Sequence, residues 1–320
     1  MKVALTHNLR RTAEEAEAEF DTPETIAALC RAVAEAGHDA VPVEVSGSIE
    51  TWTARLWELR PAVVLNSAEG LRGEARTALV PAVLEALGLR FTGSGARVQV
   101  LTQDKHLTKL CVAAAGVPVI PGGLVRAGHG DPALPPGPWF VKPNFEGSSK
   151  GISEQSVVAE RVGLEAALAA GLALYPEGIL VEQFVPGTDV TIGFVEGQDP
   201  EILTPCSYEI AAAWMNRYRI YDYRLKNVAP DEVVQPVCPA RVPPEIRQVV
   251  ARHAQSAVKA LGLRGLARLD FRVRDDGEVF FVEANATPSL EPGSSIFVAA
   301  RVAGRSYGEV IAHLISHAAA

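Results

Sequence analysis

The chain has 320 residues, enough for two or three domains of roughly 100–200 residues each. Its composition, with 48% hydrophobic and 21% charged residues, is typical of a globular protein with a substantial core. The net charge of −8 argues against a general nucleic-acid-binding protein, and no apolar run reaches the roughly 18 residues of a membrane span. We therefore expect neither nucleic acid nor a membrane as a partner.

The N-terminus and the cysteines bear on where the protein works. The first residues, MKVALTHNLRR, predict a strand with a polar end and lack the long apolar stretch of a signal peptide. No CxxC pair occurs, so free thiols are expected instead of zinc or disulfides at Cys30, Cys111, Cys206 and Cys238. We predict a cytoplasmic protein.

Residues 1–100 alternate between strand and helix patterns. Apolar runs predict strands at Lys2–Thr6, Asp39–Val45 and Ala62–Asn66. A helix is expected to begin at Pro23, with Thr22 as its N-cap, and to end at Gly37, and Val80–Leu87 forms another. This alternation predicts a parallel sheet in an α/β domain.

An acidic run follows the first strand and contains Glu14, Glu15, Glu17, Glu19 and Asp21. Such runs are usually solvated surface, which is the favoured interpretation. The alternative is a site for a substrate ammonium group, because open α/β sheets bind ligands just past the carboxyl ends of their strands.

The next segment places two lysines where a phosphate could bind. We predict one helix over Val98–Ala115, which bears Lys105, and a strand that starts within Gly116–Val119. A proline-rich loop, Asp131–Pro138, precedes an apolar run that leads through Lys142 into the loop Glu146–Gly151. The loop amides, hydroxyls and lysines would cradle a polyphosphate, although the Walker A spacing is absent. The alternative is an ordinary Gly/Ser hairpin with solvated lysines.

Strands are predicted at Gly178–Val185 and Asp189–Val195, and a helix at Pro243–Leu261. Between the second of these strands and the helix, a long polar excursion covers Ile202–Pro239. Its aromatic and cationic part, Trp214–Lys226, is expected to be a lid over a small-molecule site.

A hairpin supplies the clearest geometric indication of chemistry. Gly265–Val273 and Val279–Asn285 predict two paired strands. Asp270 on the first strand and Glu283 and Asn285 on the second have spacings that let their side chains converge. Such oxygen ligands suit Mg²⁺, which takes one or two carboxylates together with substrate phosphates. The alternative is a polar sheet face covered by charge pairs.

Several motifs together carry a family resemblance. They are Asp104–Lys109, Val141-Lys142-Pro143 with Glu146–Gly151, Val181–Phe184, Ala267–Phe271 and Glu283–Pro288. In order and spacing this set resembles the D-alanine–D-alanine ligase family of ATP-grasp enzymes, from about Asn66 to the C-terminus. The resemblance implies an α/β domain (1–100) and two α+β lobes that grip ATP (101–186 and 187–320).

The resemblance also implies roles for individual residues. Lys105, Lys142 and Lys226 would bind phosphates, Glu182 and Val185 adenine, and Asp189 the ribose. Ser148 and Ser149 would lie in the loop over the reaction centre, and Arg268 would stabilise an oxyanion. Asp270, Glu283 and Asn285 would hold Mg²⁺, with Mn²⁺ as a substitute. Ser294 would bind the carboxylate of the second substrate.

The implied reaction is ATP-dependent ligation of two amino-acid-like substrates through an acyl phosphate, performed by a homodimer. The chain departs from the family pattern after the first strand, at Asn227 where a tyrosine is usual, and in Ser289–Gly293. We therefore hypothesise substrates other than two D-alanines. Alternatives are cyclisation of a single amino-acid derivative and an ATP-binding regulator without turnover. A dinucleotide oxidoreductase is disfavoured because no G-x-G-x-x-G follows the first strand.

Overall fold

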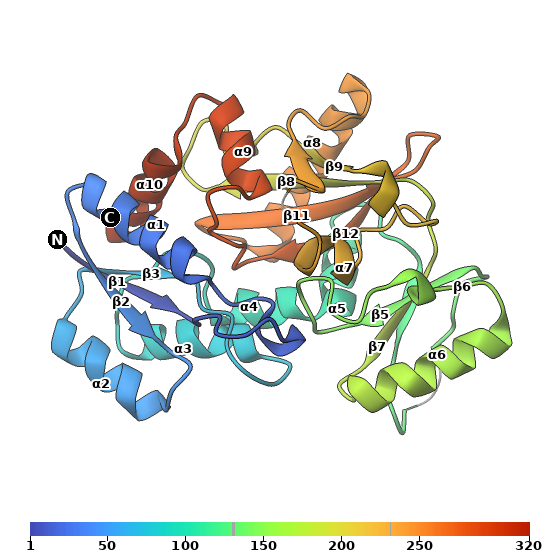
Figure 1. The fold of residues 1–320 in the computed structure, drawn as a ribbon, viewed down its shortest axis with the longest axis horizontal. Helices are drawn as coiled ribbons and strands as arrows, with labels where there is room; N and C mark the ends of the chain where they lie inside the picture. Colours follow the sequence, from blue (N-terminus) through green and yellow to red (C-terminus); the bar gives the residue numbers. More distant parts are fainter. Residues whose placement is uncertain (130–131, 231) are drawn as a thin grey trace.

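A computed structural model describes residues 1–129, 132–230 and 232–320 (Figure 1). Within these ranges the strands form three sheets, with orders β2-β1-β3, β4-β7-β5-β6 and β10-β9-β8-β11-β12. Asp131, the first residue of the predicted proline-rich loop, lies outside the described residues.

The first sheet is parallel, as predicted. β1 (Lys2–His7) lies between β2 (Asp39–Glu44) and β3 (Val63–Asn66). Helices α1 (Pro23–Glu35), α2 (Ile49–Leu59) and α3 (Leu79–Ala86) and the short η1 (Glu15–Glu17) and η2 (Arg76–Ala78) connect or follow these strands. The predicted cap of α1 is confirmed, because the Thr22 side chain accepts a hydrogen bond from the Thr25 amide.

The C-terminal helix, α10 (Tyr307–Ala319), returns to this first sheet. Its buried face, which includes Ile311, shares one core cluster with Leu5 of β1 and Leu29 of α1. The two ends of the chain consequently lie on the same side of the molecule (Figure 1).

The prediction of a single helix over Val98–Ala115 is wrong. The structure has α4 (Ala96–Gln103) and α5 (Lys105–Ala114), separated by Asp104 in an extended conformation with φ −86° and ψ 99°. The Asp104 carboxylate accepts hydrogen bonds from the Leu107 amide, at 3.0 Å, and from the Asn144 side chain, at 2.8 Å. The break places Lys105 in the first turn of a helix, where its side chain is buried.

The second sheet contains β4 (Gly122–Val125), β5 (Trp139–Pro143), β6 (Val157–Val158) and β7 (Ile179–Gln183), with α6 (Arg161–Leu174) packed on it. The short η3 (Glu154–Ser156) precedes β6. The strand predicted to start within Gly116–Val119 starts later, at Gly122, and Val119 forms only an isolated bridge to Phe281.

The third sheet carries the predicted hairpin of β11 (Leu266–Val273) and β12 (Val279–Asn285), flanked by β8 (Thr188–Val195). The amphipathic helix α8 (Pro244–Leu261) covers one face of the sheet and shares the core cluster of Phe271 and Phe281. α9 (Ser295–Val302) follows the hairpin. A register shift between Asp270 and Phe271 interrupts the pairing of β11 with β12 beside the predicted metal ligands.

The excursion Ile202–Pro239 is more ordered than predicted. It contains β9 (Cys206–Ile210), η4 (Ala212–Trp214), α7 (Tyr223–Asn227) and β10 (Val234–Val237), and the two strands extend the third sheet. Between β9 and β10, the Tyr223 amide donates a hydrogen bond to the Ile152 carbonyl at 3.1 Å, which joins this part of the chain to the segment that leads into β6.

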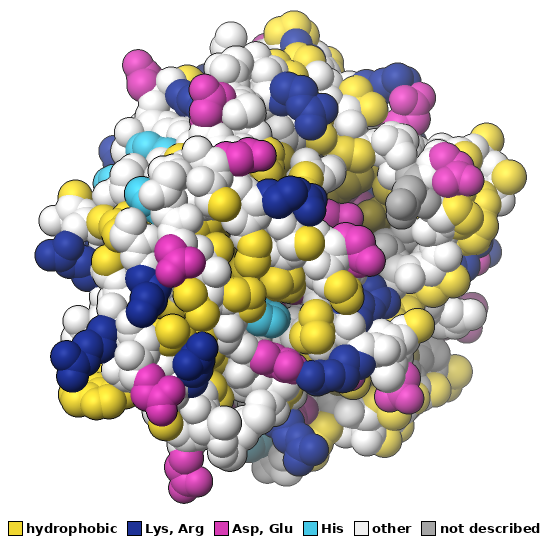
Figure 2. Space-filling view, turned by 60° about the vertical axis from the view of Figure 1, so that its left-hand side comes forward, with side chains coloured by type: hydrophobic (Ala, Val, Ile, Leu, Met, Phe, Trp, Pro, Cys, Tyr) yellow, Lys and Arg dark blue, Asp and Glu magenta, His cyan; other side chains and the backbone are white. Residues whose placement is uncertain are grey.

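Two features of the described structure bear on membranes and on charged partners. In the described part of the chain no helix is both long and apolar enough to cross a bilayer. On the face shown in Figure 2, Lys and Arg side chains alternate with Asp and Glu side chains.

Candidate functional site

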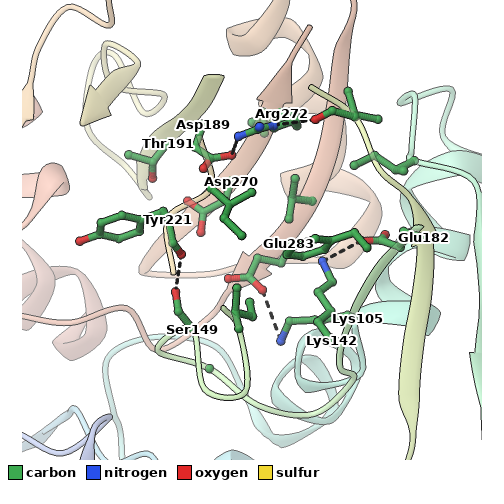
Figure 3. Close-up of a pocket in the computed structure, with 18 of the residues that line it drawn as sticks. Lys105, Lys142, Ser149, Glu182, Asp189, Thr191, Tyr221, Asp270, Arg272 and Glu283 are labelled. Atoms are coloured by element: carbon green, nitrogen blue, oxygen red, sulfur yellow. Dashed lines mark hydrogen bonds and ion pairs between the residues drawn. The ribbon is translucent and has the colours of Figure 1, made fainter. Parts of the chain in front are cut away.

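A cavity lies between the second and third sheets and is lined from both sides. β5 and β7 contribute Lys142 and Glu182, while β11 and β12 contribute Asp270 and Glu283. Figure 3 shows these side chains pointing into one space, together with Lys105 from α5. The hairpin and the lysine-bearing segments, far apart in the sequence, therefore meet at one site.

The Glu182 carboxylate is held by two lysines at the wall formed by β7. Lys142 Nζ lies 2.8 Å from Glu182 Oε2, and the Lys109 ammonium contacts the other carboxylate oxygen. Burial lowers the pKa of Lys142 to about 8 and lowers that of Lys109 as well. With both lysines protonated, one positive charge remains without a matching carboxylate at this wall.

The Glu283 carboxylate faces several cations at the opposite wall. Its Oε2 lies 3.3 Å from Lys105 Nζ, which also contacts the Glu146 carbonyl. Burial alone would raise the pKa of Glu283, but the charges of Lys105, Lys142, Arg268 and Lys226 hold it at about 2. Glu283 is therefore ionised at any physiological pH.

The three predicted metal ligands do converge. Asn285 Nδ2 lies 3.3 Å from Asp270 Oδ2 and 3.4 Å from Glu283 Oε1. Arg268 Nη2 donates to Asp270 Oδ2 at 2.9 Å, and this neighbouring carboxylate raises the pKa of the guanidinium despite its burial. Two carboxylates, an amide and a guanidinium thus form one contiguous polar cluster.

Lys226, on α7, reaches the same cluster from the lid. Among the described residues its ammonium group has no hydrogen-bond or ion-pair partner, unlike those of Lys105 and Lys142. Burial, followed by the charge of Arg268, lowers the pKa of Lys226 to about 8. An enclosed, unpaired ammonium group is suited to an anionic ligand.

The loop Glu146–Gly151 is held in a strained conformation between two segments. Ser148 and Ser149 have φ values of 50° and 56°, in the left-handed region that non-glycine residues rarely adopt. The Ser148 hydroxyl donates to the Ala18 carbonyl at 3.2 Å, and the Ser149 hydroxyl donates to the Tyr221 carbonyl at 3.0 Å. Asn227 Nδ2 donates to the Ser148 carbonyl at 2.9 Å, which ties the loop to α7.

This geometry leaves donors pointing at no protein group. Within the described ranges the backbone amides of Gly147, Ser148 and Ser149 have no hydrogen-bond acceptor. A side chain at Gly147 would also meet the Glu19 carboxylate, so it would displace that group from its contacts with Arg76 and Lys150.

Arg272 organises the end of the cavity near β8. Its Nη1 lies 2.7 Å from Asp189 Oδ1, and its Nε donates to the Val185 carbonyl at 3.0 Å (Figure 3). Apolar walls complete this end, and they include Ile120, Phe140, Ile220 and Val282.

The cavity continues into a second part that reaches the segments after β1 and β3 of the first sheet. Ser294, the N-cap of α9, lines this part together with Arg268, Lys226 and Asn285. The two parts share Lys105, Lys226, Arg268 and Glu283, which therefore lie at their junction.

The interpretation of the whole acidic run as solvated surface is wrong for Glu19. Arg76 Nη2 lies 3.0 Å from Glu19 Oε2 and 3.3 Å from Glu146 Oε2, and Lys150 Nζ bridges the same two carboxylates. This buried network joins the run to the loop over the site. Arg76 was missed because nothing around it distinguishes it from a surface arginine.

Asp21, from the same run, also lines the second part of the cavity. Its Oδ2 accepts a hydrogen bond from the Ser67 hydroxyl at 2.6 Å. Burial, together with the charge of Glu291, raises the pKa of Asp21 to about 7. The alternative interpretation of the acidic run, as part of a ligand site, therefore fits the position of Asp21.

Comparison with known proteins decides the family. A family model described as "D-ala D-ala ligase C-terminus" matches residues 136–316. A D-alanine–D-alanine ligase of Gluconobacter oxydans is 32% identical over 92% of each chain, and one of Desulforudis audaxviator is 32% identical over 90% of each. The chain belongs to the D-alanine–D-alanine ligase family.

The fold agrees with this assignment. A crystal structure of D-alanine–D-alanine ligase from Bacillus anthracis, complexed with ATP, superposes with a TM-score of 0.75, covering 99% of this chain and 97% of the other at 18% identity. The predicted ATP-grasp fold is confirmed, and the chain is an ATP-dependent ligase that forms a C–N bond.

The buried Asp21 carboxylate should reduce the stability of this ligase at neutral and alkaline pH. Its pKa is raised in the folded state, so the cost of ionisation grows between about pH 4 and pH 7 and is fully present above about pH 7. Asp21→Asn should raise the melting temperature by about 2 °C or more at pH 8, and by less at pH 5. Thermal unfolding at both values, with exposed Glu24→Gln as control, measures this effect, and equal shifts for the two variants would contradict it.

Proposed function

We propose that this ligase uses ATP to activate the carboxylate of one amino-acid-like substrate and joins it to the amine of a second. The observation that carries the proposal is the junction of the two cavity parts. There Lys105 and Lys226 lie beside Glu283 of the hairpin cluster, and Lys142 faces the same cluster from the wall formed by β7. A polyphosphate fits one side of that junction and an amino acid the other.

ATP would occupy the part of the cavity between the second and third sheets. The apolar walls and the backbone at Glu182–Val185 would receive the adenine, and Asp189 the ribose. Arg272 already engages one oxygen of Asp189, which leaves the other oxygen for a hydroxyl group. The lysines and the free amides of Gly147–Ser149 would bind the phosphates.

The cluster on the hairpin fits Mg²⁺, with Mn²⁺ as a substitute. Asp270 and Glu283 offer carboxylate oxygens, and Asn285 offers an amide oxygen once its side-chain amide rotates. A bound ion would neutralise charge on the transferring phosphoryl group. Lys105, Lys142 and Lys226, which line the same cavity, would share in neutralising that charge.

Arg268 and Ser294 would act on the amino-acid side. Arg268 lies at the junction, bonded to Asp270, where a positive charge would stabilise the oxyanion of the tetrahedral intermediate. Ser294 would bind the carboxylate of the second substrate, supported by its position at the start of α9.

The loop Glu146–Gly151 and the lid Trp214–Lys226 would exclude water from the site. The contacts of Ser149 with Tyr221 and of Asn227 with Ser148 join the two across the cavity. The Tyr223 amide adds a third contact, to the Ile152 carbonyl at 3.1 Å. A closed loop and lid would protect an acyl phosphate from hydrolysis before the amine attacks.

Other parts of the proposal concern organisation. We infer a division into domains 1–100, 101–186 and 187–320, which the three separate sheets support, with α10 returning to cover the first sheet. We also propose a cytoplasmic homodimer. Exposed apolar side chains on the adjacent helices α3, α4 and α5 support a subunit interface: Leu79, Val100, Leu107 and Leu110.

The proposed reaction predicts phosphate release from ATP and Mg²⁺ that depends on amino acids. D- and L-amino acids would be tested singly and in pairs, with mass detection of products. We expect release to require a particular pair and to yield a dipeptide-mass product. Because the amino-acid segments depart from the family pattern, D-alanine alone should be a poor substrate.

Two outcomes would contradict this proposal. A product that has lost one water from a single compound would indicate cyclisation. ATP binding without phosphate release across the whole panel would indicate a regulator.

The metal cluster predicts a specific loss in a single variant. Glu283→Gln keeps the shape of the side chain but removes a charge that faces Mg²⁺ and several cations, so metal-dependent phosphate release should fall by about 100-fold or more. The matched control is Glu278→Gln on the same hairpin, where the carboxylate is exposed and pairs with Arg274. Circular dichroism would verify the fold, and full activity of Glu283→Gln would remove this residue from the metal site.

A further inference from the structure

Three carboxylates at one end of the second cavity part form no ion pair with any described residue. This acidic end consists of Asp21, Glu69 and Glu291, which all line the cavity. In the described structure none of the three forms an ion pair, and only Asp21 has a side-chain hydrogen bond, from Ser67. The neighbouring carboxylates of Glu19 and Glu146 differ, because Arg76 and Lys150 neutralise them.

The three carboxylates come from different parts of the chain and lie close together. Asp21 lies between β1 and α1, Glu69 follows β3, and Glu291 lies in the loop before α9. Burial raises the pKa of Asp21, and the charge of Glu291 raises it further. Burial and the charge of Glu19 raise the pKa of Glu69, the charge of Asp21 adds to this effect, and the charges of Arg76 and Lys150 oppose it. Folding therefore brings carboxylates together even though their like charges repel each other.

One cation, Arg10, also lines this second part of the cavity outside the junction. Its Nε donates to the Thr12 carbonyl at 3.2 Å, and within the described ranges it makes no ion pair with Asp21, Glu69 or Glu291. Even a full charge at Arg10 would leave the acidic end with a surplus of negative charge.

A separate observation indicates that a polar ligand occupies this second part of the cavity. Thr77 lines the same cavity and is 5% exposed, yet its hydroxyl oxygen has no hydrogen-bond partner among the described groups. A buried hydroxyl without a partner is costly, so a polar ligand group within its reach would be stabilised.

The ligand group is better matched by an organic cation than by a metal ion. In the described part of the chain no group of three or more His, Cys, Asp or Glu side chains is arranged to hold a metal. Asp21, Glu69 and Glu291 thus lie close enough to interact through charge but too far apart to coordinate one ion. An ammonium or guanidinium group at the end of a flexible chain suits such spacing.

The position of the acidic end relative to the proposed carboxylate site indicates that a substrate would carry the cation. Glu291 precedes Ser294 by one turn, and the Ser294 amide donates to the Glu291 carbonyl at 3.0 Å. A substrate with its carboxylate near Ser294 and Arg268 would have its side chain within reach of Glu291 and Asp21.

We propose that one of the two substrates is a basic amino acid, whose side-chain ammonium or guanidinium group is bound by Asp21 and Glu291. This inference rests on the proposed ligase function, since it names the substrate class of the same site. The α-ammonium group alone would leave part of the surplus negative charge unpaired, whereas a second positive charge would pair with it.

The test measures binding and turnover separately. Lysine, ornithine and arginine, each in D- and L-forms, would be titrated by calorimetry into the protein loaded with Mg²⁺ and a β,γ-imido analogue of ATP, with D- and L-alanine for comparison. The same amino acids would be assayed for phosphate release, alone and in pairs. Variants would be Asp21→Asn and Glu291→Gln, with Glu24→Gln as the control on an exposed surface.

We expect at least one basic amino acid to bind at least tenfold more tightly than alanine. Each cavity variant should weaken that binding about tenfold or more, as loss of about 1.4 kcal/mol would, while binding of the ATP analogue stays unchanged. Equal binding of basic and neutral amino acids, or a preference that survives both variants, would overturn the inference. Phosphate release with pairs of neutral amino acids would then still support the ligase function. Tight binding of a basic amino acid without any phosphate release would contradict the ligase function but not the proposed binding of a basic side chain.

Discussion

The site depends on the attraction between lysines on separate elements and the carboxylates of one hairpin. Lys105 and Lys226 come from α5 and α7, while Glu283 lies on β12, and each side chain is largely enclosed. Enclosure makes these charges interact strongly, as the low pKa of Glu283 shows. An ATP-dependent ligase needs positive charges that are partly offset by carboxylates, because ATP carries several negative charges into a site that must also exclude water.

A second group of buried charges joins the first domain to this site. Arg76, from the segment after β3, binds both Glu19 and Glu146, and Lys150 binds the same two carboxylates. Removing one member would leave a buried charge without its partner, so the network holds the loop in place. The network also neutralises Glu19, so this carboxylate has a structural role, whereas the nearby Asp21 has no ion-pair partner among the described residues.

The elements with strong local patterns were predictable from the sequence. The hairpin of β11 and β12 has apolar alternation and a turn, so its spacing allowed Asp270, Glu283 and Asn285 to converge, although a polar face covered by charge pairs was an alternative from the spacing alone. The break at Asp104 was not predictable, because helix-forming residues flank it and its stabilising partner, Asn144, lies 40 residues away. Likewise, nothing local marks Arg76 or Asp21 as enclosed, since their partners Phe145 and Ser67 lie 69 and 46 residues away in the sequence.

The central claim is that a substrate carboxylate attacks ATP to form an acyl phosphate. The most direct test uses an amino acid labelled with ¹⁸O in its carboxylate and measures the isotope in the released phosphate by ³¹P NMR. If the claim is right, one labelled oxygen appears in each phosphate when the acyl-donating substrate carries the label. Phosphate without label from either substrate would mean that water attacks ATP, and that the site is not a carboxylate-activating ligase.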